Sequence, residues 1–133
     1  MVVLEGFRSM RECDVTVIAC MDFRFQGALH EYCDAEFGYL SYDLLTAPGG
    51  AKVCASADPA WCRAYAHASL ELAVDKHRAE RVVLLMHEDC GAYKAAGHTF
   101  HNFAAEMEFL RNELLKGGEW VGEFFPTVKV ELG

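Results

Sequence analysis

The motif Cys20-Met21-Asp22-Phe23-Arg24 holds a thiol, a carboxylate and a guanidinium, alternating with large apolar side chains. Strict alternation predicts an extended stretch, in which successive side chains point to opposite sides. We therefore expect Cys20, Asp22 and Arg24 to share one side, with the apolar side chains docked in the core. A plain Asp22–Arg24 salt bridge beside a buried thiol is the alternative interpretation.

A second motif, H-x-x-C-G, is formed by His87, Cys90 and Gly91. A His and a Cys three residues apart lie on one face of a turn, so both can reach one ion, and glycine lets the chain fold tightly behind them. The motif directly follows the apolar run 82–86, which is the clearest strand of the sequence. If the strands before the two motifs are neighbours in a parallel sheet, Cys20 meets His87 and Cys90.

Two thiols and one imidazole suit Zn²⁺ in tetrahedral geometry. Three protein ligands leave a fourth position, which catalytic zinc sites keep for water. Asp22 is the carboxylate best placed near that position. It could accept a hydrogen bond from a metal-bound hydroxide, or it could ligate the metal itself and close the site. Arg24 would hold Asp22 ionised and oriented, because a guanidinium matches a carboxylate.

The other cysteines are expected to be ordinary packing residues. His30 and Cys33 repeat the H-x-x-C spacing, but they lie inside a predicted helix and not at the end of a strand. We therefore expect no metal there. Cys13, Cys54 and Cys62 are interpreted as small buried hydrophobes, as free cysteines usually are.

The hydrophobic pattern predicts the elements that must position the two motifs. Short β-branched or alternating runs predict strands at 15–19, 42–46, 82–86 and 127–131. Helical spacing predicts helices over 26–37, from an Asp58-Pro59 start to Lys76, and from Phe100 until the glycines at 117 and 118. This order indicates an α/β fold with a mainly parallel sheet of four to five strands and helices on both faces. In such sheets ligands sit beyond the carboxyl ends of the strands.

Length and composition exclude several classes of protein. The 133 residues predict one domain, 1–133, and 53% hydrophobic against 24% charged residues predicts a packed core. A net charge of -8 argues against nucleic acid or anionic membranes as partners. We expect a cytoplasmic protein, because no apolar run is long enough for a membrane span and the N-terminal residues lack a signal pattern. Its six cysteines would then be free thiols.

Together the motifs resemble those of the β-class carbonic anhydrases. That family has C-x-D-x-R after its first strand, matched by Cys20, Asp22 and Arg24, and H-x-x-C-G after its third, matched by His87 and Cys90. The order of strands and helices agrees over residues 14–93. The resemblance implies a mostly parallel α/β domain assembled as dimers or multiples of dimers. It also implies a zinc ion held by two Cys and one His beside an Asp-Arg dyad.

The sequence departs from that family at several places near the site. Met21 and Phe23 stand where small polar residues are usual, and Thr46-Ala-Pro-Gly-Gly50 replaces an Arg-Asn-Ala-Gly stretch. Many members have a glutamine in the pocket before or near the first strand, whereas Gln26 is the single glutamine of this chain.

Our leading hypothesis is the zinc-dependent hydration of carbon dioxide to bicarbonate by a metal-bound hydroxide. A related heterocumulene, carbonyl sulfide or carbon disulfide, is an alternative substrate. The rival hypothesis is a non-catalytic zinc-binding structural or assembly protein in which Asp22 is a permanent fourth ligand. A homodimer or larger homo-oligomer is expected, because one small domain cannot easily bury the aromatic side chains of Phe7, Trp120, Phe124 and Phe125.

Overall fold

Four parallel strands form the sheet that carries both motifs, and their order across the sheet is β2-β1-β3-β4. The computed structural model describes residues 1–4, 10–39 and 41–133. Within these ranges the strands are β1 (Val15–Cys20), β2 (Asp43–Ala47), β3 (Arg81–Leu84) and β4 (Lys129–Leu132). The two motif-bearing strands, β1 and β3, are direct neighbours, which is the condition under which the two motifs were expected to meet.

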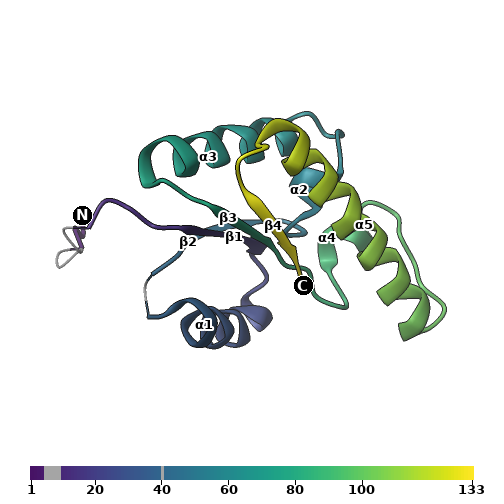
Figure 1. Cartoon of the computed structure of the whole chain (residues 1–133). Helices are drawn as coiled ribbons and strands as arrows, with labels where there is room; N and C mark the ends of the chain where they lie inside the picture. The colour runs from purple at the N-terminus through teal and green to yellow at the C-terminus, as the bar shows by residue number, and fades with distance from the viewer. Residues whose placement is uncertain (5–9, 40) are drawn as a thin grey trace.

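Helices cover both faces of this sheet. The described residues form α1 (Phe23–Phe37), α2 (Lys52–Ala55), α3 (Trp61–His77), α4 (Gly91–Ala95) and α5 (Phe103–Phe124). Helix α1 lies on one side of the sheet, and α2, α3 and α5 lie on the other (Figure 1). The predicted α/β fold, a parallel sheet of four strands between helices, is confirmed. None of the helices in the described ranges is long and apolar enough to cross a membrane.

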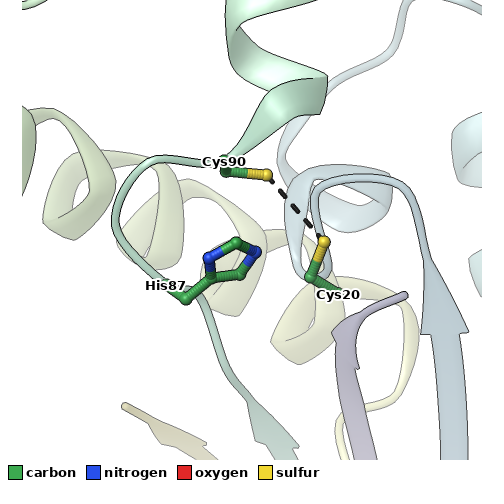
Figure 2. Close-up of side chains that lie close together, drawn as sticks. All are labelled: Cys20, His87 and Cys90. Carbon is green, nitrogen blue, oxygen red and sulfur yellow. Dashed lines mark hydrogen bonds between the residues drawn. The ribbon is translucent and has the colours of Figure 1, made fainter. Parts of the chain in front are cut away.

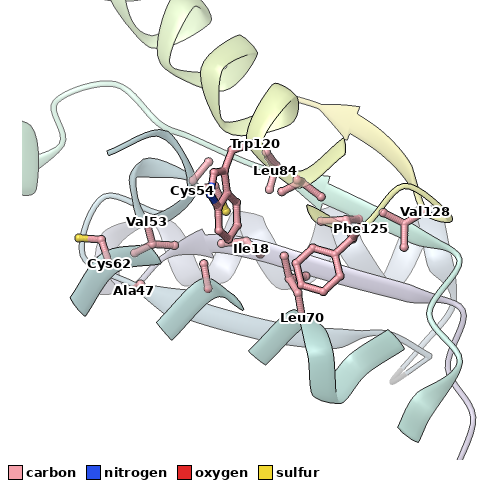
Figure 3. Packing of buried hydrophobic residues seen from close by; sticks show 14 residues of the cluster. Ile18, Ala47, Val53, Cys54, Cys62, Leu70, Leu84, Trp120, Phe125 and Val128 are labelled. Atoms are coloured by element: carbon pink, nitrogen blue, oxygen red, sulfur yellow. The ribbon is translucent and has the colours of Figure 1, made fainter. Parts of the chain in front are cut away.

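The central strand β1 is buried along its whole length because each of its faces is covered. Val15, Val17 and Ala19 pack toward α1, against Leu29 and Cys33. On the opposite face, the side chain of Ile18 joins the larger core (Figure 3), whose other labelled members include Leu70 of α3, Leu84 of β3 and Trp120 of α5. Apolar and β-branched side chains point to both faces of this strand, and burying both sets requires a central position in the sheet.

Helix α5 does not stop at its two glycines, so that prediction was wrong. It continues through Gly117 and Gly118 to Phe124. A Cβ at Gly117 would lie 3.3 Å from Leu84 Cδ1, and one at Gly118 would lie 3.2 Å from Leu132 Cδ2. The glycines are therefore places where α5 approaches the sheet closely, and this packing outweighs their low helix propensity.

Two further predictions about the helices also need correction. Helix α3 begins at Trp61 after Ala60, which forms no side-chain cap, and not at Asp58. Asp58 instead closes a turn: its backbone N–H donates to Ser56 Oγ at 3.4 Å, and that hydroxyl donates to the Asp58 carbonyl at 2.6 Å. The helix predicted from Phe100 begins at Phe103, because the side chain of Asn102 caps it by accepting from Ala105 N at 2.8 Å.

The aromatic residues near the C-terminus do not form the exposed cluster that the sequence suggested. Trp120 and Phe125 are 7% and 8% exposed because both belong to the core between α3 and α5. Phe124 is half exposed, at 50%. Phe7 lies outside the described residues. Of the described aromatic residues in this set, only Phe124 is therefore left exposed for contact with a second chain.

Candidate metal centre

Both motifs lie at the carboxyl-end edge of the sheet. Cys20 is the last residue of β1, and the loop after β3 carries His87 and Cys90. The pairing of the two strands extends by one hydrogen bond, in which Leu85 N donates to Ile18 O at 2.9 Å. Because the strands are parallel and adjacent, residues that follow them in sequence meet at one edge.

The three predicted ligand side chains converge on one point (Figure 2). The ligand atoms of Cys20, His87 and Cys90 all lie within 4.8 Å of one another. The two sulfur atoms are 3.9 Å apart, and both cysteines are 4% exposed. This is the one group of three or more metal-ligating side chains found among the described residues. The arrangement could hold a metal ion.

The imidazole of His87 is oriented for ligation. Its Nδ1 donates to the backbone carbonyl of Glu88 at 2.7 Å, so in the neutral ring the lone pair is on Nε2. Nε2 is buried and has no hydrogen-bond partner among the described residues. The ring also stacks on Phe25, with centroids 5.0 Å apart. A buried acceptor without a partner is unfavourable, and a bound cation would satisfy it.

Cys20 differs from the other buried cysteines in the direction of its pKa shift. A hydrogen bond from the Cys90 thiol lowers the pKa of Cys20 despite the burial that opposes it, and the same contact raises the pKa of Cys90. The pair therefore shares one negative charge readily. Burial, helped by the nearby charge of Asp34, raises the pKa of Cys33 to about 11, and burial raises that of Cys54 to about 12. Thiolate character, which metal ligation requires, is favoured at Cys20 and disfavoured at those two sites.

Asp22 and Arg24 form a close ion pair beside Cys20. Arg24 Nε lies 3.1 Å from each carboxylate oxygen of Asp22, and Arg24 Nη2 donates to Asp22 Oδ2 at 2.6 Å. These hydrogen bonds, together with one from the backbone N–H of Arg24, lower the pKa of Asp22 to about 2. The Asp22 side chain is 15% exposed and that of Arg24 is 53% exposed. Asp22 is not part of the group formed by the two cysteines and His87.

The predicted extended stretch through Arg24 is wrong, although the pair that it predicted is present. Helix α1 begins at Phe23 because Asp22 caps it, accepting from Arg24 N at 3.0 Å. A helix start turns the side chains by about 100° per residue, so alternation is lost. Met21 and Phe23 are consequently 59% and 85% exposed instead of docked in the core.

Gln26 is a residue whose role the sequence did not reveal. Its Nε2 donates to the carbonyl of Cys20 at 2.8 Å and to that of Asp22 at 3.4 Å. The side chain thus ties the first turn of α1 to the end of β1. Gln26 supports the backbone of the first motif, and an i to i+6 hydrogen bond of this kind leaves no periodic signal in a sequence.

The loop after β2 forms another part of the wall around the candidate centre. Pro48 and Gly49 line an open depression together with Cys20, Asp22 and Arg24. Gly50 has φ +58°, and a Cβ on it would lie 2.6 Å from Leu85 O and 2.8 Å from Cys20 N. Only glycine lets this loop approach the end of β1 so closely.

We expect Gly50→Ala to destabilise the fold by about 2–5 kcal/mol, through left-handed strain plus a clash with backbone atoms that cannot move freely. Gly97→Ala is the matched control, since Gly97 has φ +89° but nothing within 4 Å of an added Cβ. It should lose about 1–2 kcal/mol, from the φ angle alone. Urea denaturation measures both changes. Equal losses in the two variants would show that the contact with β1 is unimportant.

The competing H-x-x-C pair is not assembled into a site. His30 is exposed, and its Nδ1 lies 3.4 Å from the hydroxyl of Tyr42. Cys33 is fully buried under α1 and packs against β1. A helix start at Phe23 places these two residues on the second and third turns of α1, away from the strand ends. Neither residue belongs to the group of ligand side chains found among the described residues, Cys20, His87 and Cys90.

Two of the remaining three cysteines are buried as predicted. Cys54 and Cys62 belong to the larger core, and Cys13 is half-buried, with its thiol near the carbonyls of Val15 and Ser41 at 3.3 and 3.2 Å. All of the described cysteines are free.

Comparison with known proteins gives one match. Residues 10–125 match the family described as "Putative carbonic anhydrase". No curated protein and no solved structure matches the chain. The matched range includes both motifs, the converging Cys20, His87 and Cys90, and the Asp22–Arg24 pair. Since the match spans most of the sequence, this chain belongs to that carbonic anhydrase family.

Proposed function

We propose that this protein is a zinc-dependent carbonic anhydrase of the β-class type, which hydrates carbon dioxide to bicarbonate. The observation that carries the proposal is the convergence of two cysteines on the unpartnered Nε2 of His87, next to an ionised Asp22. Family membership supports the same activity. In the reaction a water oxygen bonds to the carbon of CO₂, an electron pair moves to one CO₂ oxygen, and one proton is released.

Zn²⁺ fits the donor set of Cys20, His87 and Cys90, which would hold it through two sulfur atoms and Nε2. Such a bound ion lowers the pKa of a coordinated water to about 7 and so supplies hydroxide at neutral pH. The hydrogen bond from His87 Nδ1 to the Glu88 carbonyl fixes the tautomer and the ring orientation that ligation needs.

We also expect a cytoplasmic location, because a reducing compartment keeps these thiols free.

Asp22 would orient the reacting water. With a pKa of about 2 its carboxylate is ionised throughout the neutral range, so it only accepts hydrogen bonds. A water beside Cys20 that donates a hydrogen bond to Asp22 keeps an oxygen lone pair that can face the carbon of CO₂. Arg24 keeps the carboxylate in place through its three side-chain contacts. CO₂ is uncharged, so the nearby Met21 and Phe23 do not oppose its approach.

The rival hypothesis requires Asp22 to ligate the metal permanently. Both of its carboxylate oxygens already accept hydrogen bonds from Arg24. Ligation would have to replace some of these contacts, and a purely structural zinc site does not need the arginine. The geometry therefore favours an orienting role for Asp22 over that of a fourth ligand.

Stopped-flow CO₂ hydration by zinc-verified protein tests the proposal. We expect activity to rise from pH 6 to pH 9 as the reacting water loses its proton, with a midpoint near the ~7 typical of zinc-bound water. Carbonyl sulfide and carbon disulfide should be assayed on the same preparation, because they share the linear, uncharged geometry. Zinc-loaded protein that hydrates none of the three substrates would contradict the proposed function.

We propose a homodimer or larger assembly, on a basis that differs from the aromatic cluster. Met21 and Phe23 are both exposed and line the same depression at the candidate centre. Large exposed apolar side chains that lie together are frequent at protein interfaces. Light scattering should therefore show a mass of at least two chains at micromolar concentration, and a monomer would be the contrary result.

A further inference from the structure

Arg24 is held from two sides, and the second side is the loop that carries His87 and Cys90. Besides its contacts with Asp22, Arg24 Nη1 donates to Asp89 Oδ2 at 2.9 Å, and Nη2 donates to the Asp89 carbonyl at 3.2 Å. One guanidinium therefore joins the capping residue of α1 to the middle of the H-x-x-C loop. The motif pattern leaves this loop position open to any residue.

Asp89 is itself held in a defined orientation. Its Oδ1 accepts from Lys94 Nζ on α4, which leaves Oδ2 for Arg24. Its backbone N–H donates to Glu106 Oε1 on α5 at 2.7 Å. The residue has φ +56°, a left-handed conformation that Asp and Asn adopt more readily than most residues. Arg24 thus contacts Oδ2 of Asp89, the carboxylate oxygen that faces α1.

The second anchor matters because Arg24 is half exposed. An exposed ion pair with Asp22 alone restrains a long, solvated side chain only weakly. The contact with Asp89 removes much of the freedom that Arg24 would otherwise have, and so the orientation of Asp22 also depends on it. Residues that hold a functional group through another side chain typically change activity by about 10- to 100-fold when they are removed.

We propose that Asp89 is a positioning residue, which holds Arg24 and through it keeps the Asp22 carboxylate on the wall that it shares with Cys20. The proposal rests on the proposed function, in which Asp22 orients the reacting water. Asp89 is not one of the residues whose ligand atoms converge, which are Cys20, His87 and Cys90. We therefore expect its side chain to affect the orientation of Arg24 and Asp22 and not metal binding. The hydrogen bond between Arg24 and Asp89 also links the two motifs directly, in addition to the pairing of β1 with β3.

Asp89→Gly is the most informative variant, because glycine tolerates φ +56° and keeps the backbone carbonyl that Arg24 contacts. We expect kcat for CO₂ hydration to fall about 10- to 100-fold, with KM and zinc content unchanged. Asp89→Asn keeps an oxygen acceptor and the backbone conformation, so its kcat should lie between those of Asp89→Gly and the wild type. Glu71→Gln, at an exposed acid on α3 and far from both motifs in the sequence, should keep wild-type kcat.

A double-mutant cycle separates this role from a general effect on the loop. If Asp89 acts through Arg24, then Asp89→Gly should cause no further loss in an Arg24→Ala background. A full additional loss in that background would overturn the proposal. So would wild-type kcat in Asp89→Gly, or loss of zinc from it, since the latter would mean that Asp89 only keeps the ligand loop folded.

A measurement that needs no activity tests the contact itself. The Nη1 hydrogens of Arg24, which donate to the Asp89 side chain, should exchange slowly with water by ¹⁵N NMR in the wild type and in Glu71→Gln. They should exchange faster in Asp89→Gly. Unchanged exchange in Asp89→Gly would overturn the proposal. If the zinc-loaded wild type hydrates no substrate, the proposed function fails, whereas this exchange measurement still decides whether Asp89 holds Arg24.

Discussion

Asp22→Asn should keep close to one zinc per chain and yet lower CO₂ hydration by about 10²–10⁴-fold, the range that orienting and general-base groups contribute. The carboxylate only accepts hydrogen bonds, whereas an amide also presents an N–H₂ group that can donate to the reacting oxygen in the wrong sense. Metal analysis and stopped-flow hydration on the same preparation measure the two quantities.

The Asp22→Asn substitution should preserve the cap at the start of α1. Asp22 caps α1 by accepting from Arg24 N, and Asn is an equally good residue at the N-cap of a helix. The variant should therefore unfold at a similar temperature to the wild type, so that a loss of activity reports on the site. Loss of zinc from Asp22→Asn would contradict the prediction, because it would make Asp22 a fourth ligand, as the structural rival requires.

Cys90→Ala should abolish zinc binding, whereas Cys33→Ala should keep close to one zinc per chain. Removing one sulfur leaves two protein ligands, too few for a stable zinc site. Cys33 is buried under α1 with a raised pKa, and its loss only leaves a small cavity. Metal analysis after dialysis against a weak chelator distinguishes the two variants.

Thermal unfolding provides an independent control for this pair. A metal that binds only the folded state stabilises it, so added Zn²⁺ should raise the Tm of metal-free wild type and of Cys33→Ala. It should leave the Tm of Cys90→Ala unchanged. If instead Cys33→Ala loses zinc while Cys90→Ala retains it, the ligand assignment made here is wrong.

Much of the candidate centre could be predicted from the sequence, because it depends on the order of short motifs and strands. A β-branched run ending at Cys20 and an apolar run ending before His87 read as buried parallel strands, and the carboxyl ends of such strands share one edge. The types of the side chains then indicated zinc. The Asp22–Arg24 pair could be predicted too, since two residues of opposite charge separated by one position meet in many local conformations.

Tertiary structure decided the features that depend on contacts between distant segments. Helix α5 continues through Gly117 and Gly118 because the sheet lies directly against them, which helix propensity does not register. Trp120 and Phe125 are buried because α3 and α5 close over them. The hydrogen bonds from Arg24 to Asp89 exist because neighbouring parallel strands bring the two loops together. A sequence pattern records which side chains are available, but long-range packing determines which of them meet.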